Sequence, residues 1–515
     1  MSKETTTTQN DLQVIISHCK EYGFIFPSSE IYDGLGAVYD YGPYGVELKN
    51  NLQQYWWKAM VQLNENIVGI DAAIFMHPKT WKASGHVDAF NDPLIDNKDS
   101  KKRYRADVLI EDYVAKIEEK INKDVEKAEK KFGETFDKAM FLQTNPNVLR
   151  NREKADGINA RFKAALEAGD LAEVRQIIVD LEIACPISGT RNWTEVRQFN
   201  LMFSTEVGSV AEEASTIYLR PETAQGIFVN FLNVLNTSRQ RIPFGIAQVG
   251  KAFRNEIVAR QFIFRTREFE QMEMQFFVRP GTEMEWYEKW KADRMKWHRS
   301  LGFPQEKLNY KDHLKVAHYA NAAVDIEFAF PFGIKEIEGI HSRTDFDLTQ
   351  HQNLSGKKLQ YFDSELNQSY VPYVIETSIG LNRTFLALMC NGYKKEKLDG
   401  DNERVVLALP PFLAPVQIGI FPLVNKDGLS EKAEEIYNEL KWDFKCFMEE
   451  KDSIGKRYRR MDAIGTPYCI TVDHQTLEDN TVTIRERDTM KQDRINIEQL
   501  KQIVAERVDW KKGLR

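Results

Sequence analysis

Arginines and carboxylates gather in one short stretch of this 515-residue chain. Its charged members are Arg254, Glu256, Arg265, Arg267, Glu268, Glu270 and Glu273, with Glu222 and Arg383 farther away along the chain. A guanidinium group can bind two phosphate oxygens at once, whereas a carboxylate suits an ammonium group or a magnesium ion. The set could therefore bind a zwitterion and a polyphosphate together, although any single member could equally form a surface ion pair.

Two predicted strands frame this charged stretch. Over residues 242–246 and 272–276, apolar residues alternate with other side chains, which is the period of a β-strand. The polar residues between them, 256–266, predict a long basic loop in an antiparallel hairpin. On the second strand Gln271, Glu273 and Gln275 form a polar row that could face solvent. The neighbouring arginines favour a surface that faces a ligand.

A second candidate site lies where a strand meets a helix. Residues 371–375 predict a strand, Ser378 and Gly380 follow it, and residues 381–390 predict a helix whose first amides could hold an anion. This arrangement is common and weakly specific. Residues 245–252 nearly match the phosphate-loop pattern GxxxxGK[ST], but Ala252 lacks the hydroxyl that would bind magnesium, and the run lies within a predicted strand. We therefore reject a phosphate loop.

Helical patterns precede the charged stretch. In residues 111–136 apolar residues recur at three-, four- and seven-residue spacings among lysines and glutamates. A second helical pattern covers residues 159–181 and is broken at Gly169. Together they predict a helical insertion, which is either a solvated structural arm or an arm that contacts RNA.

Composition limits the compartment and the partners. The net charge of −7 requires that any nucleic acid be bound by local basic patches. Five scattered cysteines without a CxxC pair indicate reduced thiols and a cytoplasmic protein. Residues 405–424 are long and apolar enough to span a membrane, but prolines break them, so we expect no membrane contact and a domain boundary near Pro410. Beyond Pro422 we predict an α/β domain of about 100 residues.

Several motifs resemble those of a known family. Residues 253–256 (FRNE) with 265–273 (RTREFEQME) resemble motif 2 of class II aminoacyl-tRNA synthetases, in the form specific to glycyl-tRNA synthetases. The other similar segments are 41–57 (motif 1 region), 219–226 (LRPETAQG), 342–348 (SRTDFDL), 380–383 (GLNR, motif 3), 454–458 and 465–468 (anticodon-binding domain). On these segments, which extend over nearly the whole chain, it is identified as a member of the homodimeric glycyl-tRNA synthetase family.

The resemblance implies an α+β fold. It has a class II catalytic domain on an antiparallel sheet, with a helical insertion, and a C-terminal α/β anticodon-binding domain. The expected divisions are residues 1–100 for the N-terminal part of the catalytic domain with motif 1, 101–185 for the helical insertion, 186–409 for the catalytic core with motifs 2 and 3, and 410–515 for the anticodon-binding domain. Motif 1 would form the interface of a homodimer.

The implied activity is the ATP-dependent attachment of glycine to tRNA(Gly) through a glycyl-adenylate, with AMP and pyrophosphate as products. Two alternatives stay open. One is a class II synthetase for another amino acid, such as proline, serine or threonine. The other is a non-catalytic nucleic-acid-binding relative, against which the presence of Arg254, Arg265 and Arg383 together argues.

The resemblance also implies roles for individual residues. Arg254 would hold the α-phosphate and Arg265 the γ-phosphate, while Phe269 would stack on adenine with Arg383 over its other face. Glu336 would help to bind Mg²⁺ with the ATP. The full expected ATP-binding set is Arg254, Asn255, Glu256, Phe264, Arg265, Thr266, Arg267, Glu268, Phe269, Glu336, Ile337, Gly380, Leu381, Asn382 and Arg383.

Glycine has no side chain, so its site must hold the ammonium group with carboxylates and exclude anything larger. The expected substrate-binding set is Arg105, Glu222, Phe269, Glu270, Gln271, Met272, Glu273, Glu376, Thr377, Ser378, Ile379 and Gly380. Relatives often carry proline where Thr377 stands and alanine where His341 stands. We therefore expect the contacts of the glycine site near Thr377 and His341 to differ from those of such relatives.

Two further expectations concern tRNA and zinc. Lys456, Arg457, Arg459 and Arg460 form a basic run beside Tyr458, which suits RNA backbone contact or a merely solvated surface. Some relatives carry CxxC pairs near positions 97–100 and 185–188, like a zinc knuckle. Only Cys185 remains here, so we expect no structural zinc.

Overall fold

The computed structural model describes residues 2–133, 136–208, 215–256, 261–313, 320–398 and 403–514. Contacts divide the chain into two compact units, which are described separately. The first comprises Met1–Ser84, Phe203–Arg254 and Ala259–Arg515, and the second comprises Gly85–Met202 and Asn255–Val258. Within the described ranges, no helix combines the length and the apolar character that a membrane span needs.

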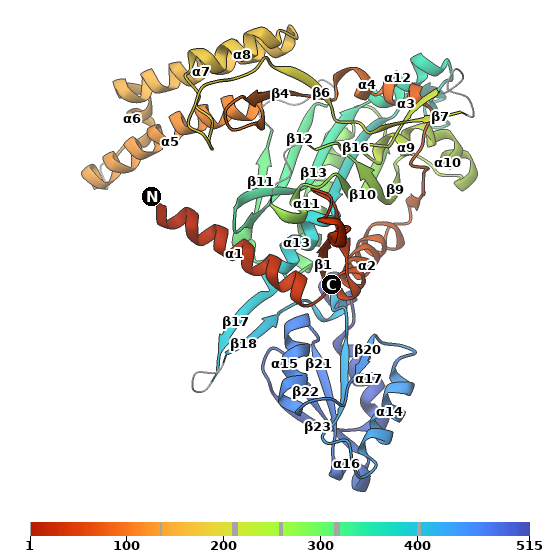
Figure 1. The fold of residues 1–515 in the computed structure, drawn as a ribbon. Helices are drawn as coiled ribbons and strands as arrows, with labels where there is room; N and C mark the ends of the chain where they lie inside the picture. The colour runs from red at the N-terminus through yellow and green to blue at the C-terminus, as the bar shows by residue number, and fades with distance from the viewer. Residues whose placement is uncertain are drawn as a thin grey trace. The chain divides into compact units, whose positions relative to one another are not determined.

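A seven-stranded sheet forms the centre of the first unit (Figure 1). Its strands, in spatial order, are β11 (Leu308–Asp312), β12 (Ala322–Phe330), β13 (Gly333–Thr344), β16 (Tyr373–Gly380), β10 (Glu268–Val278), β9 (Phe244–Phe253) and β3 (Ile67–Gly69). All neighbours are antiparallel except β3, which runs parallel to β9. The expected hairpin is confirmed, and residues 245–252 lie within β9 and not in a phosphate loop.

The two faces of this sheet differ in chemistry because strand side chains alternate. Met272, Met274 and Phe276 of β10 are fully buried in the main hydrophobic core. That face packs against α2 (Pro43–Trp57), α11 (Glu283–Ser300) and α13 (Leu381–Gly392). The opposite face carries the polar row of β10. The helices beside it are α3 (Pro78–Ala83), α9 (Ala224–Val229), α10 (Phe231–Ser238) and α12 (Phe346–Ser355) (Figure 1).

The C-terminal part of the first unit has a sheet and a core of its own. The sheet order is β20 (Cys446–Met448), β19 (Ile418–Pro422), β21 (Tyr468–Val472), β22 (Thr481–Glu486) and β23 (Gln492–Asn496). Its helices are α14 (Leu429–Leu440), α15 (Ile454–Ile464), α16 (His474–Asp479) and α17 (Ile497–Arg507), whereas α18 (Lys511–Leu514) contacts α11. The predicted α/β domain is confirmed, although the sequence pattern did not indicate α15.

The second unit joins helices to a small sheet. The sheet order is β5 (Lys102–Arg105), β4 (Asn91–Asn97) and β6 (Arg197–Asn200), and the helices are α4 (His86–Ala89), α5 (Ala106–Phe132), α6 (Lys138–Thr144), α7 (Pro146–Glu167) and α8 (Leu171–Asp180). The predicted break at Gly169 is confirmed, because α7 ends before it and Asp170 caps α8 by accepting from the Glu173 amide. Helix α5, the first of the two predicted helices, begins five residues earlier than predicted and ends at Phe132.

The remaining elements of the described chain are short, apart from the first helix. They are α1 (Ser2–Glu21), β1 (Ile25–Pro27), β2 (Tyr39–Tyr41), β7 (Ser204–Val207), β8 (Ser215–Tyr218), β14 (Tyr361–Asp363), β15 (Gln368–Tyr370), β17 (Tyr393–Lys397) and β18 (Glu403–Leu407). Single helical turns are η1 (Glu30–Tyr32), η2 (Lys58–Gln62), η4 (Phe262–Phe264), η5 (Gln305–Lys307) and η6 (Pro411–Leu413). Strand β18, η6 and β19 occupy the apolar run 405–424.

Candidate functional site

The polar row of β10 lies inside the protein. Glu273 is 1% exposed and Gln275 is fully buried, while Gln271 is half-buried. The solvent-facing alternative for this row is therefore excluded. Phe269, Gln271, Glu273 and Gln275 project from the same face of one strand, since they are two residues apart.

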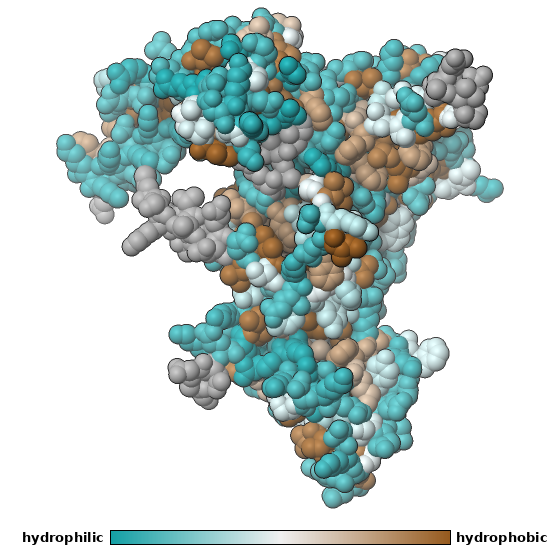
Figure 2. Space-filling view, in the orientation of Figure 1, coloured by the Kyte–Doolittle hydropathy of each residue, from teal (hydrophilic) through white to brown (hydrophobic). Residues whose placement is uncertain are grey.

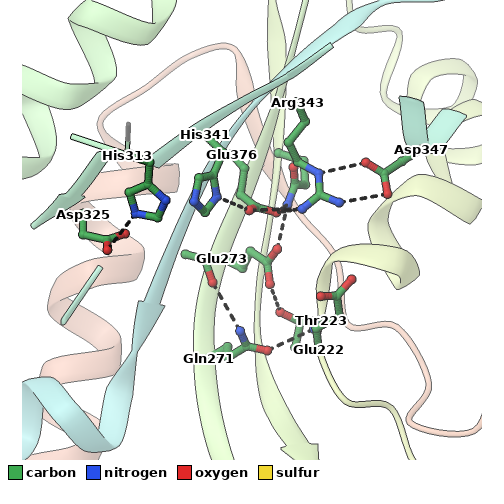
Figure 3. Close-up of polar contacts among 12 residues, drawn as sticks. Glu222, Thr223, Gln271, Glu273, His313, Asp325, His341, Arg343, Asp347 and Glu376 are labelled. Carbon is green, nitrogen blue, oxygen red and sulfur yellow. Dashed lines mark hydrogen bonds and ion pairs between the residues drawn. The ribbon is translucent and has the colours of Figure 1, made fainter. Parts of the chain in front are cut away.

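Three carboxylates meet around this row (Figure 3). Thr223, at the start of α9, donates its hydroxyl hydrogen to Glu273. The Gln275 amide Nε2 donates to Glu273 Oε1 at 2.6 Å and to Glu376 Oε2 at 2.7 Å. Electrostatic interactions link Glu273 to Glu222 as well. The structure thus brings together the three carboxylates that were expected to form an acidic glycine pocket.

A buried arginine, Arg343, binds two carboxylates beside this cluster. Arg343 forms two hydrogen bonds with Asp347, from Nε at 2.8 Å and from Nη2 at 3.0 Å, and its Nη1 lies 3.1 Å from Glu376 Oε2 (Figure 3). His341 Nδ1 lies 2.8 Å from Glu376 Oε1. Both side chains thus approach Glu376 from β13, the strand that pairs with β16.

Gln225 connects two parts of this network. Its Nε2 donates at 3.0 Å to both Glu222 and Asp347, and its Oε1 lies 2.7 Å from Nε2 of His351. Because Oε1 can only accept, His351 carries the hydrogen on Nε2. Four residues of this network were not predicted as site residues: Gln225, Arg343, Asp347 and His351. The first three lie in the motifs at 219–226 and 342–348.

The pKa values of Glu273 and Glu376 are shifted in opposite directions. Burial raises the pKa of Glu273 well above its usual value, and the neighbouring Glu376 and Glu222 raise it further. Burial also acts to raise the pKa of Glu376, but Arg343 and His341 outweigh it and hold that pKa far below the usual range. The pKa of His341 is raised, because its contact with Glu376 outweighs the effect of burial. One carboxyl group is therefore charged and compensated, while its neighbour resists ionisation.

Arg220 is a structural arginine beside this cluster. It is 2% exposed, and it donates from Nε to the Lys251 carbonyl at 2.6 Å and from Nη1 to the Ala72 carbonyl at 2.7 Å. A Cβ atom at Gly250 would lie 2.2 Å from Arg220 Nη2. Glycine at position 250 thus makes room for a guanidinium group that fastens the loop before α9 to the sheet.

The motif 2 hairpin places an arginine on an aromatic ring. The Arg254 guanidinium lies 5.2 Å from the centre of the Phe269 ring, and its Nε donates to the Pro221 carbonyl at 3.0 Å. Cation–π contact and the carbonyl orient the group at the end of β9. Arg265 follows η4 and is half-buried.

A second arginine, Arg383, lies in the first turn of α13. Arg383 lies 4.5 Å from the centre of the Phe264 ring and forms an ion pair of 3.1 Å with Glu336. Its Nε also lies 3.3 Å from the Phe264 carbonyl. The structure thus brings together Phe264, Glu336 and Arg383 from three separate segments of the expected ATP set, while stacking of Arg383 and Phe269 on adenine stays a prediction.

Other expected site residues have structural contacts. The Glu270 carboxylate accepts from Lys49 at 2.5 Å and also from Gln53. The backbone amide of Glu270 donates to Asn382 Oδ1 at 3.2 Å. Glu268 pairs with Lys251. Thr266 Oγ1 donates to the Glu268 carbonyl at 2.9 Å, Arg267 Nη1 to that of Gly36 at 3.2 Å, and Gln271 Nε2 to Ser378 Oγ at 3.3 Å. Gly380 precedes the first turn of α13.

Several expected residues belong to other parts of the structure. Met272, Ile337, Ile379 and Leu381 belong to the main hydrophobic core. Thr377 alternates with Glu376 and Ser378, pairs with Met274 and Ile340, and is fully buried. Arg105, Asn255 and Glu256 belong to the second unit, where Arg105 pairs with Asp92 at 3.1 Å and Asp107 at 2.5 Å.

The basic run of α15 divides into exposed and buried members. Lys456 and Arg459 are exposed and Arg460 is half-buried. Arg457 is 2% exposed, and its Nη1 donates to the carbonyls of Pro422 at 2.7 Å and Glu449 at 3.1 Å. Arg457 therefore fastens α15 to neighbouring loops, and Lys456 and Arg459 are the members presented to solvent.

The four positions compared with a zinc knuckle meet in the second unit through hydrogen bonds. Cys185 Sγ lies 3.1 Å from the Tyr104 hydroxyl and 3.4 Å from Ser100 Oγ. Asn97 Oδ1 accepts from the Ser100 amide at 2.9 Å and from Ser188 Oγ at 3.1 Å. Among the residues that the structure describes, no group of three or more His, Cys, Asp and Glu side chains is placed to hold a metal ion.

Comparisons with known proteins agree with this fold. A family model described as the tRNA synthetase class II core domain (G, H, P, S and T) matches residues 203–391, which contain β9, β10, β13 and β16. The part of the sheet within these residues therefore has the fold of the class II aminoacyl-tRNA synthetase core. An anticodon binding domain matches residues 417–507, and glycyl-tRNA synthetase insertion domain 1 matches residues 92–201.

Curated relatives extend the match over nearly the whole chain. A protein named glycine--tRNA ligase from Chlorobaculum tepidum is 51% identical over 95% of this chain and 98% of its own length. Proteins of the same name from Macrococcus caseolyticus and Staphylococcus haemolyticus are 49% and 48% identical, over 98% and 97% of this chain and 100% and 99% of their own. The chain belongs to the glycine--tRNA ligase family, which confirms the expected family and fold class.

Proposed function

We propose that this protein attaches glycine to tRNA(Gly) in two steps: glycine and ATP form glycyl-adenylate and pyrophosphate, and the glycyl group then moves to the terminal ribose of the tRNA with release of AMP. The observation that carries the proposal is the face of β10, where Phe269 and Glu273, a member of the acidic cluster, lie on one strand. At about 3.4 Å per residue, Glu273 lies about 14 Å from Phe269, with Gln271 midway. That spacing fits an aminoacyl-adenylate laid along the strand.

In this arrangement the two ends of this face of β10 bind different parts of the substrates. Phe269 stacks on adenine, and Arg254 at the end of β9 holds the α-phosphate and stabilises its charge as the glycine carboxylate attacks. Arg265 holds the γ-phosphate, and Arg383 covers the base from the start of α13. Glu222, Glu273 and Glu376 receive the ammonium group, and the packed walls exclude larger amino acids.

Magnesium enters with ATP as its counter-ion. Mg²⁺ commonly uses one or two protein carboxylates together with phosphate oxygens and water. Glu336 fits this requirement as a single carboxylate, since its side chain is 45% exposed and lies beside Arg383. The ion would neutralise phosphate charge there, and Arg383 would keep Glu336 in place.

The amino acid specificity can be tested by ATP–pyrophosphate exchange with each of the twenty amino acids. We expect exchange with glycine alone, because activation needs no tRNA and the site excludes side chains. Exchange with proline, serine or threonine would keep the class of enzyme and overturn the pocket assignment. No exchange from folded protein would favour a nucleic-acid-binding role without catalysis.

We also propose that the exposed end of α15 contacts the tRNA backbone. The surface of this C-terminal domain is mainly hydrophilic in Figure 2, and a localised basic pair suits an RNA partner for a chain of net charge −7. The fixed position of Arg457 supports this surface without contributing a free charge to it.

Replacing both Lys456 and Arg459 with alanine should weaken aminoacylation and leave ATP–pyrophosphate exchange with glycine unchanged. The slope of log tRNA affinity against log salt should fall in magnitude by about 1 for each phosphate contact removed. Filter binding across a salt series measures this slope. Lys432→Ala on α14 is a matched control, since Lys432 pairs with Glu435 in the same domain. An unaltered slope would place the tRNA contact elsewhere.

The assembly and location follow the same proposal. Motif 1 contributes to a homodimer, and the exposed apolar side chains nearby, Ile31 at 87% and Leu35 at 58%, support an interface there. The protein acts in the cytoplasm, with catalytic segments at 1–100 and 186–409, the helical insertion at 101–185 between them, and the anticodon-binding domain at 410–515.

A further inference from the structure

The carboxyl groups of Glu273 and Glu376 belong to one tight network. The same nitrogen, Gln275 Nε2, donates to both at 2.6 and 2.7 Å, which places an oxygen of each carboxyl group beside a single atom. Two ionised carboxylates this close repel strongly in a buried site. A proton or a cation must therefore compensate the pair.

The basic side chains of the cluster contact Glu376 and not Glu273. Arg343 and His341 both contact Glu376. In the described part of the chain, no Lys, Arg or His side chain forms an ion pair with Glu273. Arg220 interacts with Glu273 electrostatically, but its Nε and Nη1 bind backbone carbonyls. Glu273 instead accepts hydrogen bonds from two uncharged donors, Thr223 and Gln275.

The wider surroundings do not remove this imbalance. His313, beyond His341, pairs with Asp325 at 2.8 Å and not with Glu273. The charged or titratable groups of the elements packed around Glu273 are Arg220 and Glu222 before α9, His341 and Arg343 on β13, Asp347 and His351 on α12, and Glu376 on β16. Burial and the two nearby glutamates all oppose ionisation of Glu273.

We propose that Glu273 carries a proton when no glycine is bound, donates it in a hydrogen bond to Glu376, and loses it when the ammonium group of glycine binds. The O–H bond of Glu273 breaks and its proton passes to solvent. The ammonium N–H groups then donate to both carboxylates. The net charge of the cluster is unchanged, since one positive charge replaces another. This inference rests on the proposed glycine site and concerns its protonation.

The exchange of a proton for an ammonium group has a measurable pH dependence. Below the pKa of Glu273 in the free protein, glycine affinity should rise by about tenfold per pH unit, because each binding event releases about one proton. The sign follows from the raised pKa: acid holds the proton on Glu273 and competes with glycine. A carboxylate already ionised at neutral pH would give no such competition.

Calorimetric titration of glycine into the full chain tests this inference. Measured at one neutral pH in phosphate, imidazole and Tris, the binding enthalpy should vary with the ionisation enthalpy of the buffer, with a slope of about one proton released. Infrared difference spectra of the same protein should show loss of a protonated-carboxyl band when glycine is added. The infrared measurement needs no variant and therefore does not depend on a mutant that folds.

Glu273→Gln separates the possible sources of the proton. This variant keeps an acceptor oxygen of similar shape but cannot exchange a proton, so release should vanish. Release that persists in Glu273→Gln would show that the proton comes from another group, and glycine binding without release in the unmodified protein would also overturn the inference while leaving the proposed function intact. Failure of glycine to bind, with exchange supported by another amino acid, would overturn both.

Discussion

Replacing Arg254 with alanine is expected to lower the kcat of ATP–pyrophosphate exchange with glycine by about 10²–10³-fold. The Arg254 guanidinium is oriented by the Phe269 ring and the Pro221 carbonyl, so its charge is already in place when negative charge develops on the α-phosphate. Glycine binding, which we assign to Glu222, Glu273 and Glu376, should be retained. Exchange kinetics and a glycine titration of the same preparation measure the two effects separately.

A conservative variant and a distant arginine give the controls for Arg254. Arg254→Lys keeps the charge but loses the planar fork, so it should recover only part of the rate. Arg279→Ala removes an arginine just beyond the other end of β10, where it pairs with Asp363 at 2.7 Å and is 40% exposed, and should leave exchange unchanged. Normal exchange in Arg254→Ala would refute the role given to Arg254.

Local patterns predicted the elements that bear the site. Alternation over residues 272–276 placed Glu273 and Gln275 on the face opposite Met274, and β10 has this arrangement. The break at Gly169 was predictable because Asp170 is a strong helix cap. These features depend on residues close in sequence, and the motifs then supplied the family and its fold.

The compensating charges were not predictable in the same way. Arg343 and Asp347 are four residues apart, a spacing typical of a surface ion pair, and only the pairing of β13 with β16 places Arg343 beside Glu376. Arg457 looked equivalent to Lys456 and Arg459 within a basic run. The unpredicted helix α15 turns it inward to the Pro422 carbonyl. Sequence alone identified the charged residues, whereas their partners depended on contacts between distant segments.

Arg343→Met should destabilise the catalytic domain by about 3–5 kcal/mol, the cost of breaking a buried ion pair by removing one partner. Arg343 is 7% exposed, and its loss leaves Asp347 and Glu376, 2% and 5% exposed, without their shared cation. Methionine fills much of the volume, so the effect reports charge more than packing. Scanning calorimetry of the unmodified protein and the variant measures the change.

The matched variant Arg279→Met removes an ion pair of similar length from a more exposed place and should cost about 0.2–1 kcal/mol. Arg343→Lys should fall between the two, because one ammonium group cannot bind both carboxylates as the guanidinium fork does. If Arg343→Met melts like Arg279→Met, the acidic cluster does not depend on Arg343 for its charge balance. A large loss of stability in Arg343→Met would show that Arg343 compensates the buried carboxylates of Asp347 and Glu376.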